Sequence, residues 1–597
     1  MTVYAAPLDD MRFALRHLAG LDEVAALPGF EETSPDLVDA ILDEAARFGA
    51  QVLAPLNPVG DRAGCAFENG VVRTPPGFKD AYAQFVAGGW NGVPFDPEYG
   101  GQGLPWLVST AISEIWDSAN MAFGLCPLLT QGAVELISAH GSAEQKARYL
   151  PKLVSGEWNG TMNLTETQAG SDLAAVRTRA VRDGDRWRIK GQKIFITYGE
   201  HDMTENIVHL VLARTPDAPP GVKGISLFAV PKFRIEADGR PGPRNDARCV
   251  SIEHKLGING SPTAVMAYGD DDGAVGEMIG EENRGIEYMF TMMNNARLAV
   301  GLEGVGVAER AYQQALHYAR ERRQGRALGS KDEDSVAIVR HPDVMRMLLS
   351  MKAQTQAVRA LAYFTAAGLD VAKRHPDAAE RKRRQALLDL LIPVTKAFSS
   401  DTGIEVASLG IQVHGGMGYI EETGAAQHWR DARIAAIYEG TNGIQAMDLI
   451  GRKVARDRGE TALAFAATVR DLDAELVNAD GGKFAAMREN LAAAVAAFEK
   501  STRWVAETFT KNPVPPAAGA VRYLRLLGVL AGGWLMARGA LRARALLAQG
   551  DDDRDFLEGK IVCARFYSDQ VLVEAPGLAR GVTDGWGAVA AAEPRHL

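Results

Sequence analysis

The sequence predicts a multidomain α+β protein: an N-terminal helical region, a central β-domain of barrel or sandwich type, a helical bundle, and an appended helical domain. Hydrophobic periodicity predicts this order, because it is helical to about residue 157, alternates between about 161 and 278, and is helical again from 285. Length supports it, because 597 residues exceed what one hydrophobic core holds. The chain is 47% hydrophobic and 23% charged, as is typical of folded proteins.

The first helical region divides into a predicted N-terminal extension, residues 1–33, and an α-domain, residues 34–158. Ser34 and Pro35 combine a helix N-cap with a proline in the first turn, and apolar residues follow at helical intervals. The stretch 96–103 is rich in glycine, so we expect a loop there.

The predicted β-domain covers residues 159–282. Runs rich in β-branched and aromatic residues, at 187–189, 194–197 and 207–212, predict strands. The sequence DGD at 183–185 predicts a hairpin turn between two strands.

Two helical domains are predicted after the β-domain. Residues 283–455 contain three long helical stretches, 300–319, 344–366 and 384–406, each of which suits a bundle helix. Residues 460–597 are rich in alanine and are broken once by prolines at 512–516, so we expect an appended helical domain.

Charge and cysteine usage exclude several classes of protein. A net charge of −10 argues against a general nucleic-acid binder, and the basic run at 373–384 is typical of a solvated helix face. The four cysteines lie far apart without metal-ligand spacing, so we expect reduced structural thiols and no metal site.

Neither a secretory signal nor a membrane span is predicted. The first residues lack a basic start followed by an apolar run. The apolar stretch 524–536 is shorter than the ~20 residues that a spanning helix needs, and Arg525 interrupts it. We therefore expect a cytoplasmic protein.

The most specific motif is IYEGTNGIQ at residues 437–445, which places Glu439 between an aromatic residue and a glycine just before a helix. A lone glutamate at a helix start usually faces solvent and complements the helix dipole. The whole string, however, resembles the catalytic segment of the acyl-CoA dehydrogenase family, in which the glutamate of YEGT is the base. The resemblance implies that Glu439 removes a proton from the substrate.

A second pair of strings resembles the same family: LTETQAGSD at 164–172 and GQKIFIT at 191–197. A loop of glycine and serine can present N–H and hydroxyl groups to a diphosphate. By resemblance, Thr165, Phe195 and Thr197 lie against the flavin ring of FAD, and Gly170 and Ser171 lie near its diphosphate. The family often has tryptophan where Phe195 stands.

Three more motifs match in the family's order. YARERRQ at 318–324 implies that Arg322 reaches the FAD diphosphate of a neighbouring subunit, although Gly325 and Arg326 replace the usual Phe-Gly and the loop 330–335 is longer. QVHGGMGY at 412–419 implies contacts to the adenosine side of FAD, with His414 packed rather than catalytic. NNAR at 294–297 implies an arginine near the base, and Ala296 cannot serve as the base that some subgroups have there.

These matches imply two sets of contacts. The predicted FAD contacts are Leu164, Thr165, Gly170, Ser171, Phe195, Thr197, Arg322, Gln324, Gln412, Gly415, Gly416, Tyr438 and Thr441. The predicted substrate contacts are Ser171, Asn294, Arg297, Glu439 and Gly440.

The resemblance implies the α,β-desaturation of an acyl-CoA to trans-2-enoyl-CoA, as in fatty acid β-oxidation, with electrons leaving through an electron-transfer flavoprotein. It also implies a four-helix bundle for residues 283–455. The added ends resemble a longer subgroup that includes 3-(methylthio)propionyl-CoA dehydrogenases and broad-range fatty acyl-CoA dehydrogenases, for which we expect a homodimer. Pocket depth, and with it acyl chain length, does not follow from these motifs.

Two alternatives share the flavin. An acyl-CoA oxidase would keep the base but pass electrons to oxygen. A non-catalytic relative, similar to the flavin-containing DNA-binding proteins of the alkylation response, would need a basic surface, which the acidic balance disfavours.

Overall fold

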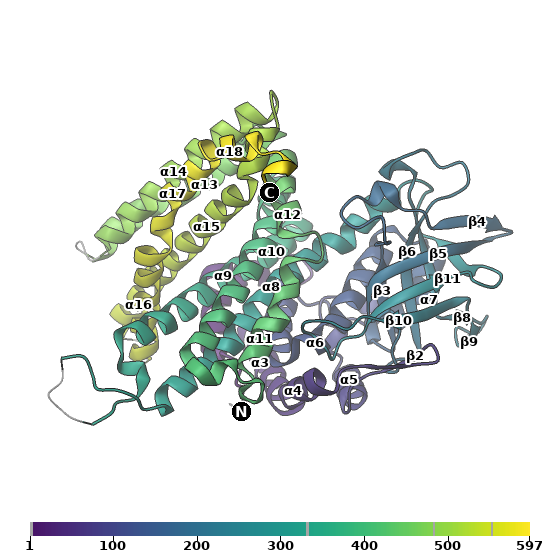
Figure 1. The fold of residues 1–597 in the computed structure, drawn as a ribbon, viewed down its shortest axis with the longest axis horizontal. Coiled ribbons are helices and arrows are strands. Elements are labelled where there is room, and N and C mark those ends of the chain that lie inside the picture. The colour runs from purple at the N-terminus through teal and green to yellow at the C-terminus, as the bar shows by residue number, and fades with distance from the viewer. Residues whose placement is uncertain (1–3, 330–333, 481–483, 551–552) are drawn as a thin grey trace. The chain divides into compact units, whose positions relative to one another are not determined.

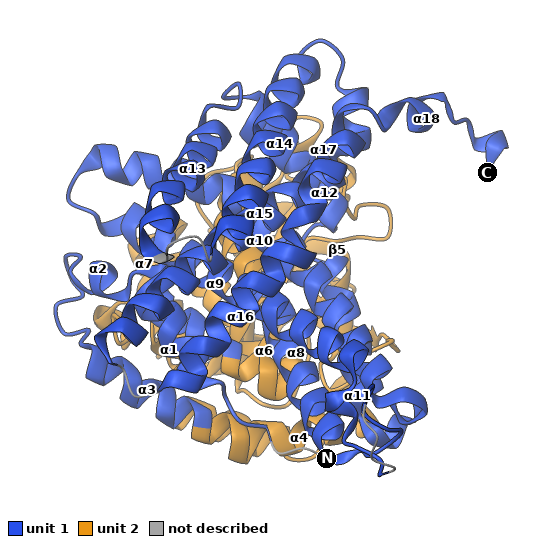
Figure 2. Cartoon of the chain, turned by 90° about the vertical axis from the view of Figure 1, so that its left-hand side faces the viewer, with its two compact units in different colours: residues 1–46, 105–114, 300–597 blue, residues 47–104, 115–299 orange. Residues whose placement is uncertain are grey.

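The computed structural model describes residues 4–329, 334–480, 484–550 and 553–597. The chain divides into two compact units, coloured separately in Figure 2. Unit 1 comprises residues 1–46, 105–114 and 300–597, and unit 2 comprises residues 47–104 and 115–299. Three helices contribute residues to both units: α3 (Pro35–Phe48), α6 (Trp106–His140) and α8 (Gly285–Glu321).

The N-terminal helices begin where their sequence signals lie. The Ser34 hydroxyl accepts a hydrogen bond of 3.1 Å from Leu37 N, which caps α3 as predicted. Within unit 2 follow η2 (Gly49–Leu53), α4 (Ala54–Ala63), α5 (Phe78–Ala87), η3 (Trp90–Gly92), η4 (Pro97–Tyr99) and α7 (Ala143–Ser155). The glycine-rich loop at 96–103 is therefore a loop with one short 3₁₀ turn.

A small hairpin interrupts this helical region, which the periodicity did not predict. Strands β1 (Ala66–Glu68) and β2 (Val71–Arg73) pair antiparallel through a two-residue turn at Asn69 and Gly70. Both turn residues have positive φ, 52° and 79°. Asn-Gly is a typical sequence for such a turn, so the sequence carries the local signal for this hairpin.

The β-domain of unit 2 is one curled sheet with the order β10-β11-β5-β12-β7-β6-β3, in which β4 also pairs with β5. Its strands are β3 (Trp158–Asn163), β4 (Arg179–Asp183), β5 (Arg186–Thr197), β6 (Asn206–Ala213), β7 (Ser226–Pro231), β10 (Ala247–Ile252), β11 (Thr263–Tyr268) and β12 (Ala274–Met278). A separate pair is formed by β8 (Phe233–Ile235) and β9 (Pro241–Arg244). The predicted hairpin at 183–185 joins β4 to β5 with Asp183 opposite Arg186.

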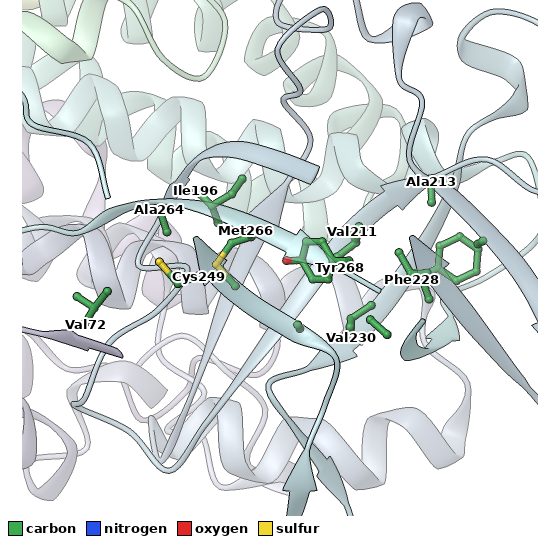
Figure 3. Close-up of a cluster of buried hydrophobic side chains, with 14 residues drawn as sticks. Val72, Ile196, Val211, Ala213, Phe228, Val230, Cys249, Ala264, Met266 and Tyr268 are labelled. Atoms are coloured by element: carbon green, nitrogen blue, oxygen red, sulfur yellow. The ribbon is translucent and has the colours of Figure 1, made fainter. Parts of the chain in front are cut away.

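Strand β5 produces the curl because it changes partners along its length. Its first part pairs with β4 and β12, and its second part, from Gly191, pairs with β11. A Cβ on Gly191 would lie 2.4 Å from Thr178 Oγ1, so only glycine fits at the corner. The sheet covers a core of buried side chains that includes Val211, Phe228 and Met266 (Figure 3).

Unit 1 is helical, and Figure 1 shows its long helices. It contains α1 (Leu8–Ala14), η1 (Leu15–Ala19), α2 (Leu21–Ala25), η7 (Ile338–Arg340), α9 (Pro342–Arg374), α10 (Ala378–His414), η8 (Gly415–Tyr419), η9 (Glu421–Thr423), α11 (Ala425–Ala432), η10 (Arg433–Ala436), α12 (Asn442–Asp448) and η11 (Leu449–Ala455). The predicted stretches 344–366 and 384–406 are the middle parts of α9 and α10.

The C-terminal part of unit 1 consists of α13 (Glu460–Asp480), α14 (Ala485–Phe509), α15 (Val514–Gln549), α16 (Arg554–Gln570), η12 (Leu572–Glu574), α17 (Ala575–Thr583), α18 (Trp586–Ala591) and η13 (Pro594–His596). Helix α15 packs against α9, α14, α16 and α17. Figure 1 shows these helices at the yellow-green end of the chain.

Two helices, α6 and α15, are long and apolar enough to cross a membrane by length and composition. In each, 83% of the apolar window is buried inside the protein, as in a core helix. The apolar stretch 524–536, too short by itself to span a membrane, is thus part of a 36-residue helix.

Candidate active site

The predicted base lies in a tight turn between η10 and α12 in unit 1. Glu439 has φ of 54° and Gly440 has φ of 80°, so two consecutive residues occupy the left-handed region. A glutamate pays a steric cost there, and such strain persists only where the surroundings hold it. A Cβ on Gly440 would lie 2.8 Å from Gln445 Nε2, so the second position requires glycine.

Side chains from two helices hold this turn. Lys396 Nζ, on α10, donates to Gly440 O and to Asn442 Oδ1, each at 2.9 Å. Gln445 Nε2, on α12, donates to Glu439 O at 2.9 Å. Lys396 and Gln445 are both buried. The carboxylate of Glu439, which is half-buried, is therefore presented from a backbone fixed on both sides.

Asn442 extends the network behind the turn. Its amide donates to Asp401 Oδ1 at 2.7 Å and to Ser400 Oγ at 3.0 Å. Burial raises the pKa of Asp401, and the hydrogen bond from Asn442 opposes that rise. Thr441 caps α12 by accepting a hydrogen bond of 3.2 Å from Ile444 N.

A second carboxyl group lies beside the base. The Tyr438 hydroxyl donates to Glu303 Oε2, and Glu303 is fully buried on α8. Burial raises the pKa of Glu303 to about 8, with the charge of Glu439 acting in the same direction, while Tyr438 and Lys396 oppose the rise. Glu303 is therefore mostly protonated at neutral pH.

In unit 2, a buried ion pair ties the loop 164–172 to strand β5. Lys193 Nζ donates to Glu166 Oε1 at 2.8 Å and to Leu164 O at 2.9 Å. Glu166 also accepts hydrogen bonds from Thr178 N and Arg177 N. Burial opposes ionisation of Glu166, but Lys193 and these hydrogen bonds outweigh it and lower the pKa to about 2. Glu166 thus joins the loop to strand β5 through a charged pair.

Phe195 leaves β5 at a bulge. Ile194 and Phe195 lie opposite the single residue Val265 of β11, and Phe195 has φ of 60°. Bulges turn a side chain away from the sheet, and Phe195 is 58% exposed although its neighbour Ile196 is buried. An exposed aromatic ring held by the backbone is a surface on which a planar ring can stack.

The other predicted FAD contacts are mostly exposed. In unit 2 these are Gly170 and Ser171, with Leu164, Thr165 and Thr197 half-buried. In unit 1 they are Arg322, Gln324, Gln412, Gly415 and Gly416. The segment at 322–325 pairs with residues 336–338 through Gln324 N to Val336 O at 3.0 Å, and residues 330–333 of the neighbouring loop lie outside the described residues.

His414 and Arg297 are buried. His414 Nδ1 lies 2.7 Å from Gly410 O, and its ring stacks on Tyr318 at 4.5 Å between centroids. Burial lowers the pKa of His414, so the ring is neutral and packed. In unit 2, Arg297 donates to Asn294 Oδ1 at 3.4 Å and lies over the ring of Phe290.

Comparison with known proteins identifies the class. Profiles of the acyl-CoA dehydrogenase family match in four parts: its N-terminal domain at residues 36–157, its middle domain at 161–270, its C-terminal domain at 283–455, and an acetyl-CoA dehydrogenase C-terminal-like domain at 462–593. The chain belongs to the acyl-CoA dehydrogenase family. It is an FAD-dependent oxidoreductase that acts on a CH–CH bond of an acyl-CoA.

Particular relatives cover nearly the whole chain. A 3-methylmercaptopropionyl-CoA dehydrogenase of Ruegeria pomeroyi is 50% identical over 97% of this chain and 98% of its own length. A broad-specificity linear acyl-CoA dehydrogenase, FadE5, of Mycobacterium tuberculosis is 34% identical over 96% of both. Among solved structures, an acyl-CoA dehydrogenase of Bacillus anthracis complexed with FAD has a TM-score of 0.74 at 22% identity, covers 98% of this chain and 92% of its own, and shares the fold.

The residues present fit FAD. Phe195 offers an exposed ring, and a Cβ at Gly170, Gly415 or Gly416 would meet nothing within 4 Å, so these backbones are open to a ligand. Arg322 is exposed and can grip a phosphate with its planar guanidinium. No cluster of three metal-ligating side chains occurs among the described residues.

The sequence motifs missed four residues that the structure places next to predicted contacts. Glu303, Lys396 and the Glu166–Lys193 pair were given no role, although the last two lie in or beside matched strings. The available signals were a glutamate inside the apolar run 298–308 and a lysine inside the apolar run 390–398.

Proposed function

We propose that this acyl-CoA dehydrogenase acts on 3-(methylthio)propanoyl-CoA, with Glu439 as the base. This choice of substrate is supported by the 50% identity to a 3-methylmercaptopropionyl-CoA dehydrogenase, which extends over 97% of this chain and 98% of the relative. The broad-specificity linear acyl-CoA dehydrogenase named above is 34% identical. Identity at this level across every domain favours a shared short thioether substrate.

The reaction removes one hydrogen from the α-carbon and one from the β-carbon of the acyl group. The Glu439 carboxylate takes the proton from the carbon next to the thioester carbonyl, and the C–H electron pair begins to form the new C=C bond. FAD, when bound, supplies the acceptor for the hydrogen that leaves the β-carbon with its electron pair. The product is the trans-2-enoyl thioester, 3-(methylthio)acryloyl-CoA for this substrate.

The turn around Glu439 contributes orientation. Its backbone N–H, by analogy with the family, donates to the thioester carbonyl, which acidifies the α-carbon. Lys396 and Gln445 fix the backbone that carries both this N–H and the carboxylate. Because the turn is held before substrate arrives, the base needs no rearrangement during proton transfer.

We further propose that electrons pass to an electron-transfer flavoprotein, that the chain forms a homodimer and that it acts in the cytoplasm. The family resemblance supports the flavoprotein. The motif at 318–324 supports the dimer, because its arginine is expected to reach the FAD of a neighbouring subunit. The acidic net charge of −10 gives no support to the DNA-binding alternative.

The first experiment is anaerobic titration of the flavin absorbance with a panel of acyl-CoAs, from butanoyl to hexadecanoyl and including 3-(methylthio)propanoyl. We expect the thioether substrate to bleach the flavin at the lowest concentration in the wild type. In Glu439→Gln, bleaching should be absent while FAD stays bound. Preference for a long linear chain would overturn the substrate, and normal bleaching in the variant would overturn the base.

The acceptor and the assembly have separate tests. With oxygen present and no added flavoprotein, hydrogen peroxide formation at the rate of substrate use would favour an oxidase. Turnover that requires an electron-transfer flavoprotein supports the dehydrogenase. Sedimentation at twice the chain mass of 64.1 kDa supports the homodimer, and sedimentation at the chain mass would reject it.

A further inference from the structure

Helix α8 carries a carboxyl group where an apolar side chain would be expected. Glu303 is 0% exposed and follows the apolar residues Leu298, Val300 and Leu302. Its Oε2 accepts the hydrogen bond from Tyr438, and its Oε1 has no hydrogen-bond partner among the described residues. A glutamate buried without a cation directly on it is costly, so its retention at this position calls for a role.

The groups that face Glu303 all belong to the base turn or to its support. Tyr438 and Glu439 come from the loop before α12, and Lys396 comes from α10. Tyr438 precedes the base directly in the chain, so the hydrogen bond to Glu303 holds the residue from which the strained Glu439 backbone starts. The contact joins positions 135 residues apart.

We propose that Glu303 is a positioning residue for removal of the α-proton: its protonated carboxyl anchors Tyr438 and leaves Glu439 as the only ionised member of this pair of carboxyl groups. This inference rests on Glu439 being the base, as proposed above. When the fully buried Glu303 ionises, a second negative charge appears beside Glu439, and each carboxylate opposes the ionisation of the other. Negative charge that develops on the thioester during proton removal is opposed as well, so proton removal slows.

The raised pKa of Glu303, about 8, places this change at the alkaline side of neutrality. Burial drives the rise and Glu439 adds to it, so the protonated form holds below pH 8 and is lost as the pH increases through it. If only the protonated form is active, the rate falls about tenfold between roughly pH 7 and pH 9.

The test measures exchange of the α-hydrogens in D₂O, using the FAD-loaded protein and a 3-thiaacyl-CoA, which can lose an α-proton but does not complete desaturation. Exchange is followed by mass spectrometry against pH. We expect the exchange rate of the wild type to decrease between about pH 7 and pH 9; this decrease is called the alkaline fall below. Glu303→Gln keeps an oxygen that can accept from Tyr438 but cannot ionise, so the fall near pH 8 should be absent.

Tyr438→Phe gives a second, independent readout. It removes the hydrogen bond that lowers the pKa of Glu303, so the alkaline fall should move to higher pH. In the double variant with Glu303→Gln, the change at Tyr438 should cause no such shift. Glu287→Gln, an exposed position on the same helix, serves as the matched control and should keep the wild-type profile.

The outcomes separate two failures. An alkaline fall that persists unchanged near pH 8 in folded, FAD-bound Glu303→Gln would overturn the role of Glu303 while leaving the function intact. If Glu303→Gln does not fold, the role of Glu303 would be overturned by an alkaline fall in Tyr438→Phe that occurs at the same pH as in the wild type. Exchange that persists in Glu439→Gln would overturn the proposed base, and with it this inference.

Discussion

Lys193 Nζ lies 2.8 Å from Glu166 Oε1, and the two side chains are 0% and 5% exposed. They join a loop predicted to contact FAD, residues 164–172, to the strand that carries Phe195. The pair is buried, so removing one partner leaves an uncompensated charge, which typically costs about 3–5 kcal/mol.

Glu166→Gln is therefore expected to lower the free energy of unfolding by about 3–5 kcal/mol and to speed the release of FAD. Urea denaturation followed by circular dichroism measures the first effect, and flavin fluorescence after dilution measures the second. Lys190→Gln, an exposed position on the same strand, is the control and should change neither. A normal rate of FAD release in Glu166→Gln would show that the loop does not depend on the pair.

The same pair predicts a pH dependence. The pKa of Glu166 is lowered from 4.5 to about 2 in the folded protein, so its contribution to stability is complete above the unfolded pKa. That contribution is lost as the pH falls from about 4.5 through 2. The stability difference between wild type and Glu166→Gln should narrow over this interval, and a constant difference would contradict the prediction.

Substitution of Lys396 is expected to lower the rate of flavin reduction by substrate. Lys396→Met removes two hydrogen bonds from the turn, to Gly440 O and Asn442 Oδ1. Hydrogen bonds from a charged donor contribute about 1.5–3 kcal/mol, so kcat should fall by about tenfold to a hundredfold, with a smaller change in KM. Stopped-flow reduction of the flavin gives both. Lys453→Met, on the partly exposed π-helical segment after α12, is the matched control.

Because Glu303 is buried and its pKa is raised, alkaline pH is expected to destabilise the wild type. Its pKa rises from 4.5 in the unfolded chain to about 8 in the folded protein, so it favours folding fully below pH 4.5, and this contribution is lost as the pH rises through 8. The melting temperature of Glu303→Gln minus that of the wild type should thus increase as the pH rises from 5 to 9. A difference independent of pH would show that Glu303 does not titrate in this range.

Short-range sequence signals predicted the helices and strands, but they could not predict contacts between residues far apart in the sequence. The hairpin at 183–185 and the start of α3 at Pro35 followed from turn and cap chemistry, because those signals act over a few residues. The anchoring of Tyr438 by Glu303 joins positions 135 residues apart, and the support of Gly440 by Lys396 joins positions 44 apart. Periodicity records that a glutamate stands in an apolar run, but not what it faces.

The motif matches located the base turn without revealing its strain. YEGT marked Glu439 through its neighbours in the chain. The positive φ of Glu439 depends on Lys396 and Gln445 holding the backbone, so it appears only once α10 and α12 are packed. Likewise, the bulge that exposes Phe195 requires the register of β11.

The N-terminal segment and the C-terminal helices of unit 1 share one buried charge network. Lys560 on α16 forms an ion pair with Asp10 on α1 and lies 4.8 Å from the ring centre of Phe13. Gln356 Nε2, on α9, donates to Asp10 Oδ1 at 3.0 Å. Burial opposes ionisation of Asp10, but Lys560 and neighbouring cations outweigh it and lower the pKa of Asp10, so this carboxyl group is ionised at neutral pH.

Asp10→Asn should therefore destabilise the folded protein by about 3–5 kcal/mol, because Lys560 remains buried without its partner. Thermal or urea unfolding measures the loss, and Asp9→Asn, an exposed neighbour, should leave stability unchanged. The double variant Asp10→Asn with Lys560→Met removes both charges, so it should be more stable than Asp10→Asn alone. Additive losses in the double variant would show that the two residues act independently, and that the N-terminal segment is held by apolar packing instead.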